Sequence, residues 1–420
     1  MAGSEKETKG NLWRHREFLK FWTGDTIIQF TGSISGLALG VVAVLTLKAN
    51  GFQLGVIVAL GFIAFPTMGL FVGVLMDRLK RKPVMIVADL IQVAALGSVP
   101  LSYSLGVLSL YQLYVVSLVM GITTLFFDVA YQSYLPSLVE KGDVVEGNQK
   151  LQTSASASGV IGPSIASVLM QLVGAALTVT VDAVGTLAGA ITLVSIRKPE
   201  PEPQPNPSGV ERSFFREMKE GIQVITGNSL LWTQAGCTGT WNLGSNVFNV
   251  AILIYALDTL GISQGVIGIV FSIGAVGFLV GVLISGRVTK TFGFGRAIAL
   301  SVATALGYFV VLLAHGAYAA PIIGVAFFVA SMGVPIYNIN QVSLRQIITP
   351  NRLQGRMNAT MRTIVWGTIP AGSLLGGVFV VTVGVIPTII VGTLISGGSV
   401  LWIVLGPIIK LKKQPEPINE

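Results

Sequence analysis

Long apolar stretches separated by short polar turns follow one another through the whole chain. A helix needs about 20 apolar residues to cross a hydrocarbon core of about 30 Å, and open strands cannot satisfy their backbone groups in lipid. The pattern therefore predicts an all-α membrane protein with twelve transmembrane helices. The expected spans are residues 21–47, 53–76, 84–104, 108–131, 150–172, 174–196, 229–257, 264–286, 297–316, 318–341, 357–381 and 386–409.

The composition excludes several other classes of protein. Hydrophobic residues make up 52% of the 420 residues and charged residues only 11%, against roughly 25% charged residues in soluble domains. The net charge of +8 does not predict a nucleic-acid partner, because the basic residues flank apolar spans, where membrane topology explains them. With one cysteine and two histidines, we expect neither a disulfide framework nor a metal site.

The basic residues also predict the orientation of the chain. Of the 27 Lys and Arg residues, Lys48 alone falls on the opposite side of the expected spans from all the others. Basic residues accumulate in cytoplasmic loops. We therefore expect a multi-pass protein of the cell membrane, embedded in the lipid bilayer, with both termini cytosolic.

A proline-rich segment divides the chain into two halves. Alternating Pro residues from position 199 to position 207 forbid a helix and favour a stiff, extended tether. We expect six spans in residues 1–196, a cytosolic linker in residues 197–228, and six spans in residues 229–420. The linker ends in an amphipathic stretch that could lie on the membrane surface or form a short soluble helix.

The loop between the second and third spans contains a charged motif, GVLMDRLKRKP at residues 73–83. It resembles the loop signature of the major facilitator superfamily, except that Lys80 stands where that family usually has Gly. The resemblance implies a transporter of two repeated six-helix halves, with a latch between this loop and an acid on the fourth helix. The matching latch residues are Gly73, Asp77, Arg78, Arg81, Lys82 and Asp128.

Three acids inside the expected spans are candidates for proton coupling, because an ionisable group is costly in lipid and is usually functional there. Asp182, near the middle of the sixth span, is the strongest candidate. Its alternative role is a hydrogen-bonded acid that only fixes helix packing. Asp25 and Asp89 lie nearer the cytosolic side and could be proton sites or merely charges near a helix end.

Small and polar residues mark two further spans. Gly159, Gly162 and Pro163 in the fifth span resemble the glycine-proline signature of proton-coupled exporters. In the seventh span, polar side chains from Thr238 to Asn249 recur at spacings of four, four and three residues, which places them on one helical face.

That polar face predicts a cavity. Polar amides at such depth need partners or water, although they could equally join neighbouring helices. The resemblance implies that the first, fourth, seventh and tenth helices line the pathway. The cavity candidates are Gln29, Ser33, Ser117, Trp241, Asn242, Asn246, Asn338 and Gln341. A cavity of amides and aromatics without midplane cations would suit a bulky, mostly apolar ligand.

Further segments resemble the macrolide-efflux and multidrug branch of the superfamily, among them residues 18–22 and 126–130. The resemblance implies a monomeric secondary transporter, not an enzyme, that exports amphipathic small molecules by proton antiport. It needs no cofactor beyond the proton gradient. The alternatives are export of a native metabolite such as a siderophore, movement of a lipid, and a substrate-sensing receptor that keeps the fold without the flux.

Overall fold

The computed structural model describes residues 12–76, 78–140, 143–200, 202, 214–413 and 415, with the backbone alone at residues 70, 74, 145, 214–219, 351–356 and 359. Asp77 of the expected latch and most of the linker lie outside the described residues. The described part is helical and contains no strand. This arrangement confirms the predicted all-α fold.

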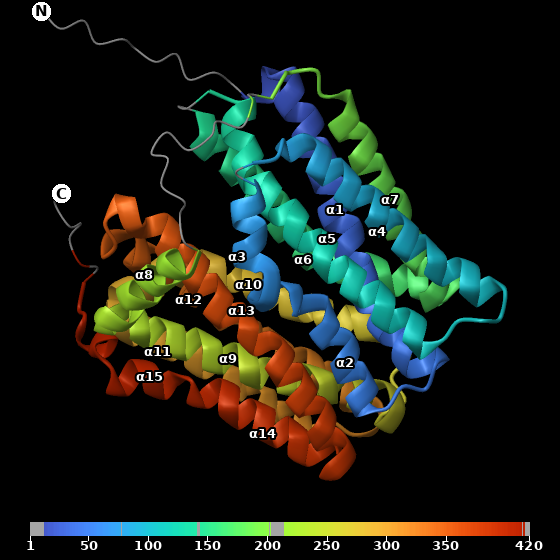
Figure 1. Ribbon diagram of the computed structural model, residues 1–420. Helices are drawn as coiled ribbons and strands as arrows, with labels where there is room; N and C mark the ends of the chain where they lie inside the picture. The colour runs from blue at the N-terminus through green and yellow to red at the C-terminus, as the bar shows by residue number, and fades with distance from the viewer. Residues whose placement is uncertain are drawn as a thin grey trace, which may run out of the picture.

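The helices form two groups joined by a short helix, α8 (Figure 1). The first group consists of α1 (Arg16–Val41), α2 (Gly51–Phe62), α3 (Ala64–Met76), α4 (Arg81–Ser104), α5 (Leu110–Leu138), α6 (Val144–Val173) and α7 (Ala175–Ser195). The helix α8 spans Phe214–Gly227. The second group consists of α9 (Ser229–Ile254), α10 (Gln264–Phe292), α11 (Phe294–Ala303), α12 (Ala319–Ile347), α13 (Asn351–Thr382), α14 (Val385–Gly398) and α15 (Val400–Leu405).

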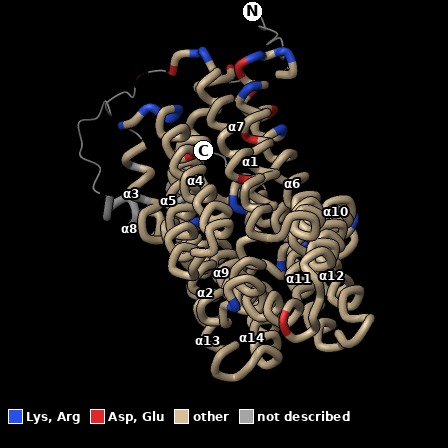
Figure 2. Tube along the Cα trace, turned by 90° about the vertical axis from the view of Figure 1, so that its right-hand side faces the viewer, with Lys and Arg blue, Asp and Glu red and all other residues tan. Residues whose placement is uncertain are grey.

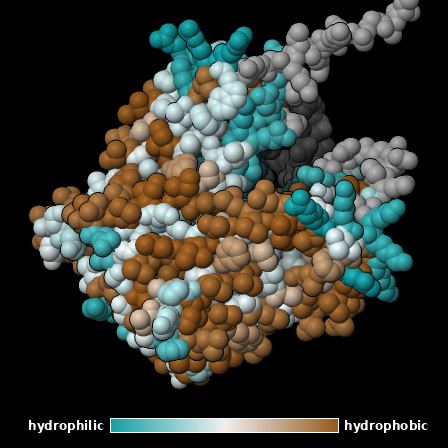
Figure 3. Space-filling model, turned by 180° about the vertical axis from the view of Figure 1, so that it is seen from behind, coloured by the Kyte–Doolittle hydropathy of each residue, from teal (hydrophilic) through white to brown (hydrophobic). Residues whose placement is uncertain are grey.

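The membrane spans agree with the predicted pattern. Within the described residues, 11 helices are long and apolar enough to cross a membrane. They do not include α9, which has 26 residues but carries the polar face noted in the sequence. Because α9 occupies the place of the expected seventh span, the observed helices are consistent with twelve spans. Figure 3 shows the broad apolar surface that such a bundle presents to lipid.

The second expected span is broken into α2 and α3 at Ile63. Pro66 stands in the first turn of α3. A proline has no N–H to donate and its ring crowds the carbonyl one turn before it, so it interrupts a helix at the preceding turn. The break at Ile63 follows from Pro66.

The two groups share an unusual local structure that supports the predicted repeat. A π-helical turn, Val42–Thr46 in the first group and Tyr255–Thr259 in the second, directly follows the opening helix of 26 residues. Both turns end in the same bonding pattern, because the Leu47 N–H donates to the Val42 carbonyl and the Leu260 N–H to the Tyr255 carbonyl. α1 and α9 are therefore equivalent elements of the two halves.

The two halves join at one end of the bundle and separate at the other. We call the end where α1 begins and α7 ends the linker end, and the opposite end the distal end. One buried cluster at the distal end contains residues of both halves, such as Val42, Leu54, Phe248 and Ile323. At the linker end each half has a buried cluster of its own. The bundle is thus closed at the distal end and open at the linker end.

Lys and Arg gather at the linker end, near the N-terminus, and most of the remaining trace is uncharged (Figure 2). Lys48 and Asp258 lie in the turns of the distal end. The separated end is therefore also the basic end.

Replacement of Gly55 by Val is expected to open the distal end. A Cβ at Gly55 of α2 would lie 2.4 Å from the backbone oxygen of Ser373 on α13, and such overpacking costs about 1–3 kcal/mol. That is enough to lower the population of this state about tenfold. Spin labels at the exposed positions 107 and 383, in a chain with Cys237→Ser, would report a longer distance across the distal end.

The control for this variant is Gly61→Val on the same helix, because nothing lies within 4 Å of a Cβ there. The label distance should stay unchanged in the control. Equal distances in Gly55→Val and the unmodified chain would show that the close α2 and α13 contact does not hold the distal end shut.

Candidate functional site

Two adjoining cavities lie between the halves. The first has a volume of about 760 Å³ and is lined mainly by α9, α12 and α13, with Gln132 of α5 and Gln152 of α6 from the other half. The second, of about 680 Å³, is lined by α1, α6, α10 and α12, and Gln152 lines it too. The separation of the halves at the linker end makes these cavities a single candidate binding region.

The two cavities differ in chemistry. The wall of the first one contains many amides and hydroxyls, together with Trp241, Trp366 and several apolar residues. The second cavity is walled by the aromatic rings of Phe271, Tyr308 and Phe327, and the last two lie 5.6 Å apart between ring centroids. A polar compartment next to an aromatic one suits a ligand with a polar end and an apolar body.

The predicted polar face of α9 reaches both cavities. Thr238, Trp241 and Asn242 line the first cavity and Asn249 lines the second. The Asn242 side-chain amide also donates to the Val365 carbonyl of α13 at 2.9 Å, so it binds helices together as well.

The other cavity candidates divide between wall and interior. Asn338 and Gln341 of α12 line the first cavity, and Ser33 of α1 lines the second. Ser117 is buried and lines neither of these cavities. The Asn246 amide donates to the Asn242 carbonyl at 2.8 Å, within α9.

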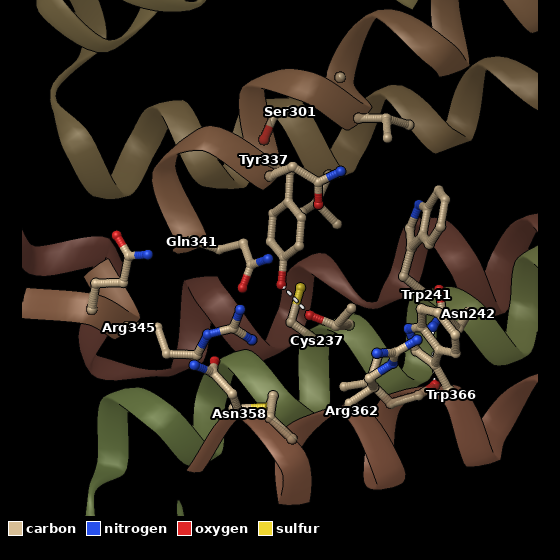
Figure 4. Close-up of a pocket in the computed structure, with 18 of the residues that line it drawn as sticks. Cys237, Trp241, Asn242, Ser301, Tyr337, Gln341, Arg345, Asn358, Arg362 and Trp366 are labelled. Carbon is tan, nitrogen blue, oxygen red and sulfur yellow. Dashed lines mark hydrogen bonds between the residues drawn. The ribbon is translucent and has the colours of Figure 1, made fainter. Parts of the chain in front are cut away.

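Two arginines also line the first cavity, both near the linker end of their helices and away from the midplane, where no cation was expected. They are Arg345 at the end of α12 and Arg362 in α13 (Figure 4). Both are among the basic residues that the topology prediction places on the cytosolic side. Arg362 nevertheless falls inside the expected span 357–381, and that depth was the signal for a functional role.

Arg362 forms an ion pair that crosses between the halves. Its Nη2 lies 2.5 Å from the Asp128 carboxylate of α5. The guanidinium also lies over the ring of Trp366, 4.1 Å from the centroid, and Phe65 of α3 packs edge-on against that ring at 4.7 Å. A cation held by both a carboxylate and an aromatic face fixes the two halves at this point.

In the described residues, two members of the expected latch, Arg81 and Asp128, have other partners. Both the Arg81 and the Lys82 backbone N–H groups donate to the Glu200 carboxylate, at 2.7 Å and 3.0 Å, and the Arg81 side chain also pairs with Glu200. Glu200 thereby caps the start of α4. Asp128 instead pairs with Arg362, so the structure does not bring Arg81 and Asp128 together.

Three acids of the first half interact electrostatically. Asp25 of α1 and Asp89 of α4 are each 3% exposed and lie close enough for their charges to interact, and Asp128 is a further electrostatic neighbour of Asp25. The Tyr131 and Gln29 side chains lie beside Asp25. We call Asp25, Asp89 and Asp128 the acid cluster. Within the described residues, Arg362 is the cation paired with it.

Asp182 has different surroundings. Its side chain is fully buried between α7 and α1, where the Ser35 hydroxyl donates to one carboxylate oxygen and the Thr186 hydroxyl donates to the other at 3.3 Å. A carboxyl group satisfied by hydroxyls of two helices stabilises their packing. These hydrogen bonds favour the alternative role for Asp182, a hydrogen-bonded acid that fixes helix packing, over a role in proton coupling.

The glycine-proline motif of α6 lies at a crowded crossing. A Cβ at Gly162 would lie 2.5 Å from the Ser33 side chain of α1, while Gly159 and Pro163 line the second cavity. On the opposite side, the Ser167 hydroxyl donates to the Gly265 carbonyl of α10. Small residues therefore let α6 contact both halves closely.

Comparison with known proteins agrees with this architecture. The family model described as Major Facilitator Superfamily matches residues 21–372. A macrolide efflux protein A of Streptococcus pyogenes is 28% identical over 385 residues, covering 90% of this chain and 92% of the relative. A protein of the same name from Enterococcus faecalis is 28% identical over 320 residues, covering 74% and 96%.

Solved structures share the fold at low sequence identity. The nucleoside transporter NupG superposes with a TM-score of 0.72 at 13% identity, covering 93% of this chain and 98% of its own. A POT family transporter in complex with 5-aminolevulinic acid superposes with a TM-score of 0.74 at 11% identity, covering 94% of this chain and 97% of its own. A bacterial homologue of the iron transporter ferroportin, in an inward-facing state, superposes with a TM-score of 0.69 at 13% identity, covering 94% of this chain and 100% of its own. This chain therefore belongs to the major facilitator superfamily, a family of membrane transporters rather than of enzymes.

Proposed function

We propose that this protein exports amphipathic small molecules, such as macrolides, across the cell membrane in exchange for protons. The acid cluster, linked through the Asp128–Arg362 ion pair to a cavity with polar and aromatic compartments, is the observation that carries the proposal. The curated relatives, which are macrolide efflux proteins by name, support the choice of cargo. The molecule acts as a monomer and uses the proton gradient as its only driving force.

The open linker end faces the cytosol in this proposal. Basic residues gather at that end (Figure 2), and basic loops stay on the cytosolic side. Both termini are then cytosolic, and the structure corresponds to the state that receives cargo from inside. Export follows when residues 1–196 and 229–420 rock about the cavities, so that the linker end closes and the distal end opens.

Proton entry acts through the acid cluster. Two buried carboxyl groups whose charges interact cannot easily both be charged, so Asp25 and Asp89 together can hold a proton away from water. A proton on Asp128 would release Arg362 and loosen the contact between the halves. The Asp128–Arg362 ion pair depends on whether a proton is bound, and it also stabilises the state that is open at the linker end. Proton binding is therefore coupled to the change between the two states.

The test uses inside-out vesicles that contain the purified protein. An imposed proton gradient should drive accumulation of a dye or a macrolide, and an uncoupler should abolish it. Vesicles with empty membranes provide the control. Specific binding without accumulation would overturn the antiporter and favour a receptor.

Asp182→Asn is expected to weaken folding without uncoupling transport. Asparagine keeps one acceptor oxygen and places an N–H donor where the other oxygen was, so one hydroxyl has to turn and accept. The weakened buried hydrogen bond costs about 1 kcal/mol. Thermal unfolding should therefore occur at a lower temperature, while the uncoupler should still abolish accumulation. A variant as stable as the unmodified protein that no longer responds to the proton gradient would make Asp182 the proton site.

A further inference from the structure

Arg345 is a cation in the first cavity for which the described residues provide no counter-charge. It stands in the last turn of α12 and lines the cavity. No carboxylate of the described chain lies within ion-pair distance of it, whereas Arg362 pairs with Asp128. Its Nε is buried without a hydrogen-bond partner. A partly buried guanidinium in this condition is costly unless something binds it.

The groups around Arg345 can complete a binding site. Gln341 lies one turn earlier on α12, and Asn358 approaches from α13 (Figure 4). All three side chains line the same cavity. The Tyr337 hydroxyl lies at the back of this space, 2.5 Å from the Thr238 hydroxyl. One guanidinium and two amides can direct several N–H donors at a single ligand group.

We infer that Arg345, Gln341 and Asn358 form an anion subsite, which receives a carboxylate, sulfonate or phosphate group of an amphipathic cargo. A guanidinium binds such groups through two parallel hydrogen bonds. The apolar part of the cargo then packs on the aromatic residues of the two cavities. This inference rests on the proposed function only for the amphipathic cargo. It favours acidic amphiphiles, including acidic metabolites, over cationic drugs.

The test compares two probes that share one apolar body. The probe 8-anilinonaphthalene-1-sulfonate carries a sulfonate, and N-phenyl-1-naphthylamine is the same molecule without it. Binding to the full chain in nanodiscs of neutral lipid is followed by quenching of tryptophan fluorescence, with empty nanodiscs subtracted. Arg345→Gln should weaken binding of the sulfonate probe about tenfold, the loss expected for a charged hydrogen bond. It should leave the affinity for the uncharged probe unchanged.

Two matched variants sharpen the result. Arg296→Gln removes the same charge from an exposed position on α11 and should change neither affinity. Arg345→Lys keeps the charge but loses the paired hydrogen bonds, so its affinity for the sulfonate probe should lie between those of the unmodified chain and Arg345→Gln. The inference is overturned if Arg345→Gln binds the sulfonate probe as tightly as the unmodified chain. It is also overturned if both probes weaken equally.

The source of the anion is tested with nanodiscs that contain anionic lipid. If lipid headgroups occupy the subsite, anionic lipid will lower the affinity of the unmodified chain for the sulfonate probe but not the affinity of Arg345→Gln. If the subsite binds a soluble cargo, anionic lipid will change the sulfonate-probe affinity of neither the unmodified chain nor Arg345→Gln. Both outcomes keep the subsite. Failure of proton-driven accumulation in vesicles, with the probe result intact, would overturn the antiporter alone.

Discussion

Arg362→Gln is expected to reduce proton-driven accumulation about tenfold. The change removes the ion pair between Arg362 of α13 and Asp128 of α5, whose atoms lie 2.5 Å apart across the two halves. A hydrogen bond between charged groups contributes about 1.5 kcal/mol or more, which corresponds to roughly a tenfold change in an equilibrium. The amide of Gln cannot replace the charge, so the state open at the linker end loses a contact that responds to protons. Initial rates of uptake into inside-out vesicles measure the effect.

Exchange of the two residues isolates the pair from other effects. Asp128→Asn should lose transport to a similar degree as Arg362→Gln. The double variant Asp128→Arg with Arg362→Asp restores opposite charges at the same place, and it should recover much of the lost rate. Arg362→Lys keeps the charge and serves as the conservative control. No recovery in the double variant, despite normal folding, would assign the loss to the separate surroundings of each residue.

The sequence predicted the helices and the polar face of α9 because both depend on local patterns. Length and hydropathy determine which segments cross lipid, and a spacing of three to four residues places side chains on one face of a helix. Trp241 and Asn242 could therefore be assigned to a cavity wall from the seventh span alone. The break between α2 and α3 was missed, although Pro66 was its local signal.

The acid cluster could not be predicted, because it depends on how separate helices are rotated against one another. Depth along a span ranked Asp182 first, but depth does not say which neighbours a carboxylate meets. Asp182 accepts hydrogen bonds from hydroxyls of α1 and α7, whereas the charges of Asp25 and Asp89 interact with each other. Arg362 was not among the predicted site residues, although its position inside the expected span 357–381 was a local signal.

The double variant Asp25→Asn with Asp89→Asn is expected to separate transport from the proton gradient. Asparagine has nearly the volume of aspartic acid but takes up no proton at this position, so the cavity keeps its shape while the buried pair loses its titratable groups. Cargo should still equilibrate down its own gradient. Accumulation driven by an imposed proton gradient should be lost, and the uncoupler should then have no further effect.

Asp258→Asn is the matched control, because Asp258 is an exposed acid at the distal end, outside the acid cluster. It should accumulate cargo as the unmodified protein does. The single variants Asp25→Asn and Asp89→Asn then show how much each carboxyl group contributes to proton coupling. The charge of Asp25 interacts with those of both other acids, whereas Asp89 interacts with Asp25, so Asp25→Asn should uncouple more completely than Asp89→Asn. Full proton-driven accumulation in the double variant would remove the pair from the mechanism and leave Asp128 as the acid of the cluster able to couple proton entry to the contact between the halves.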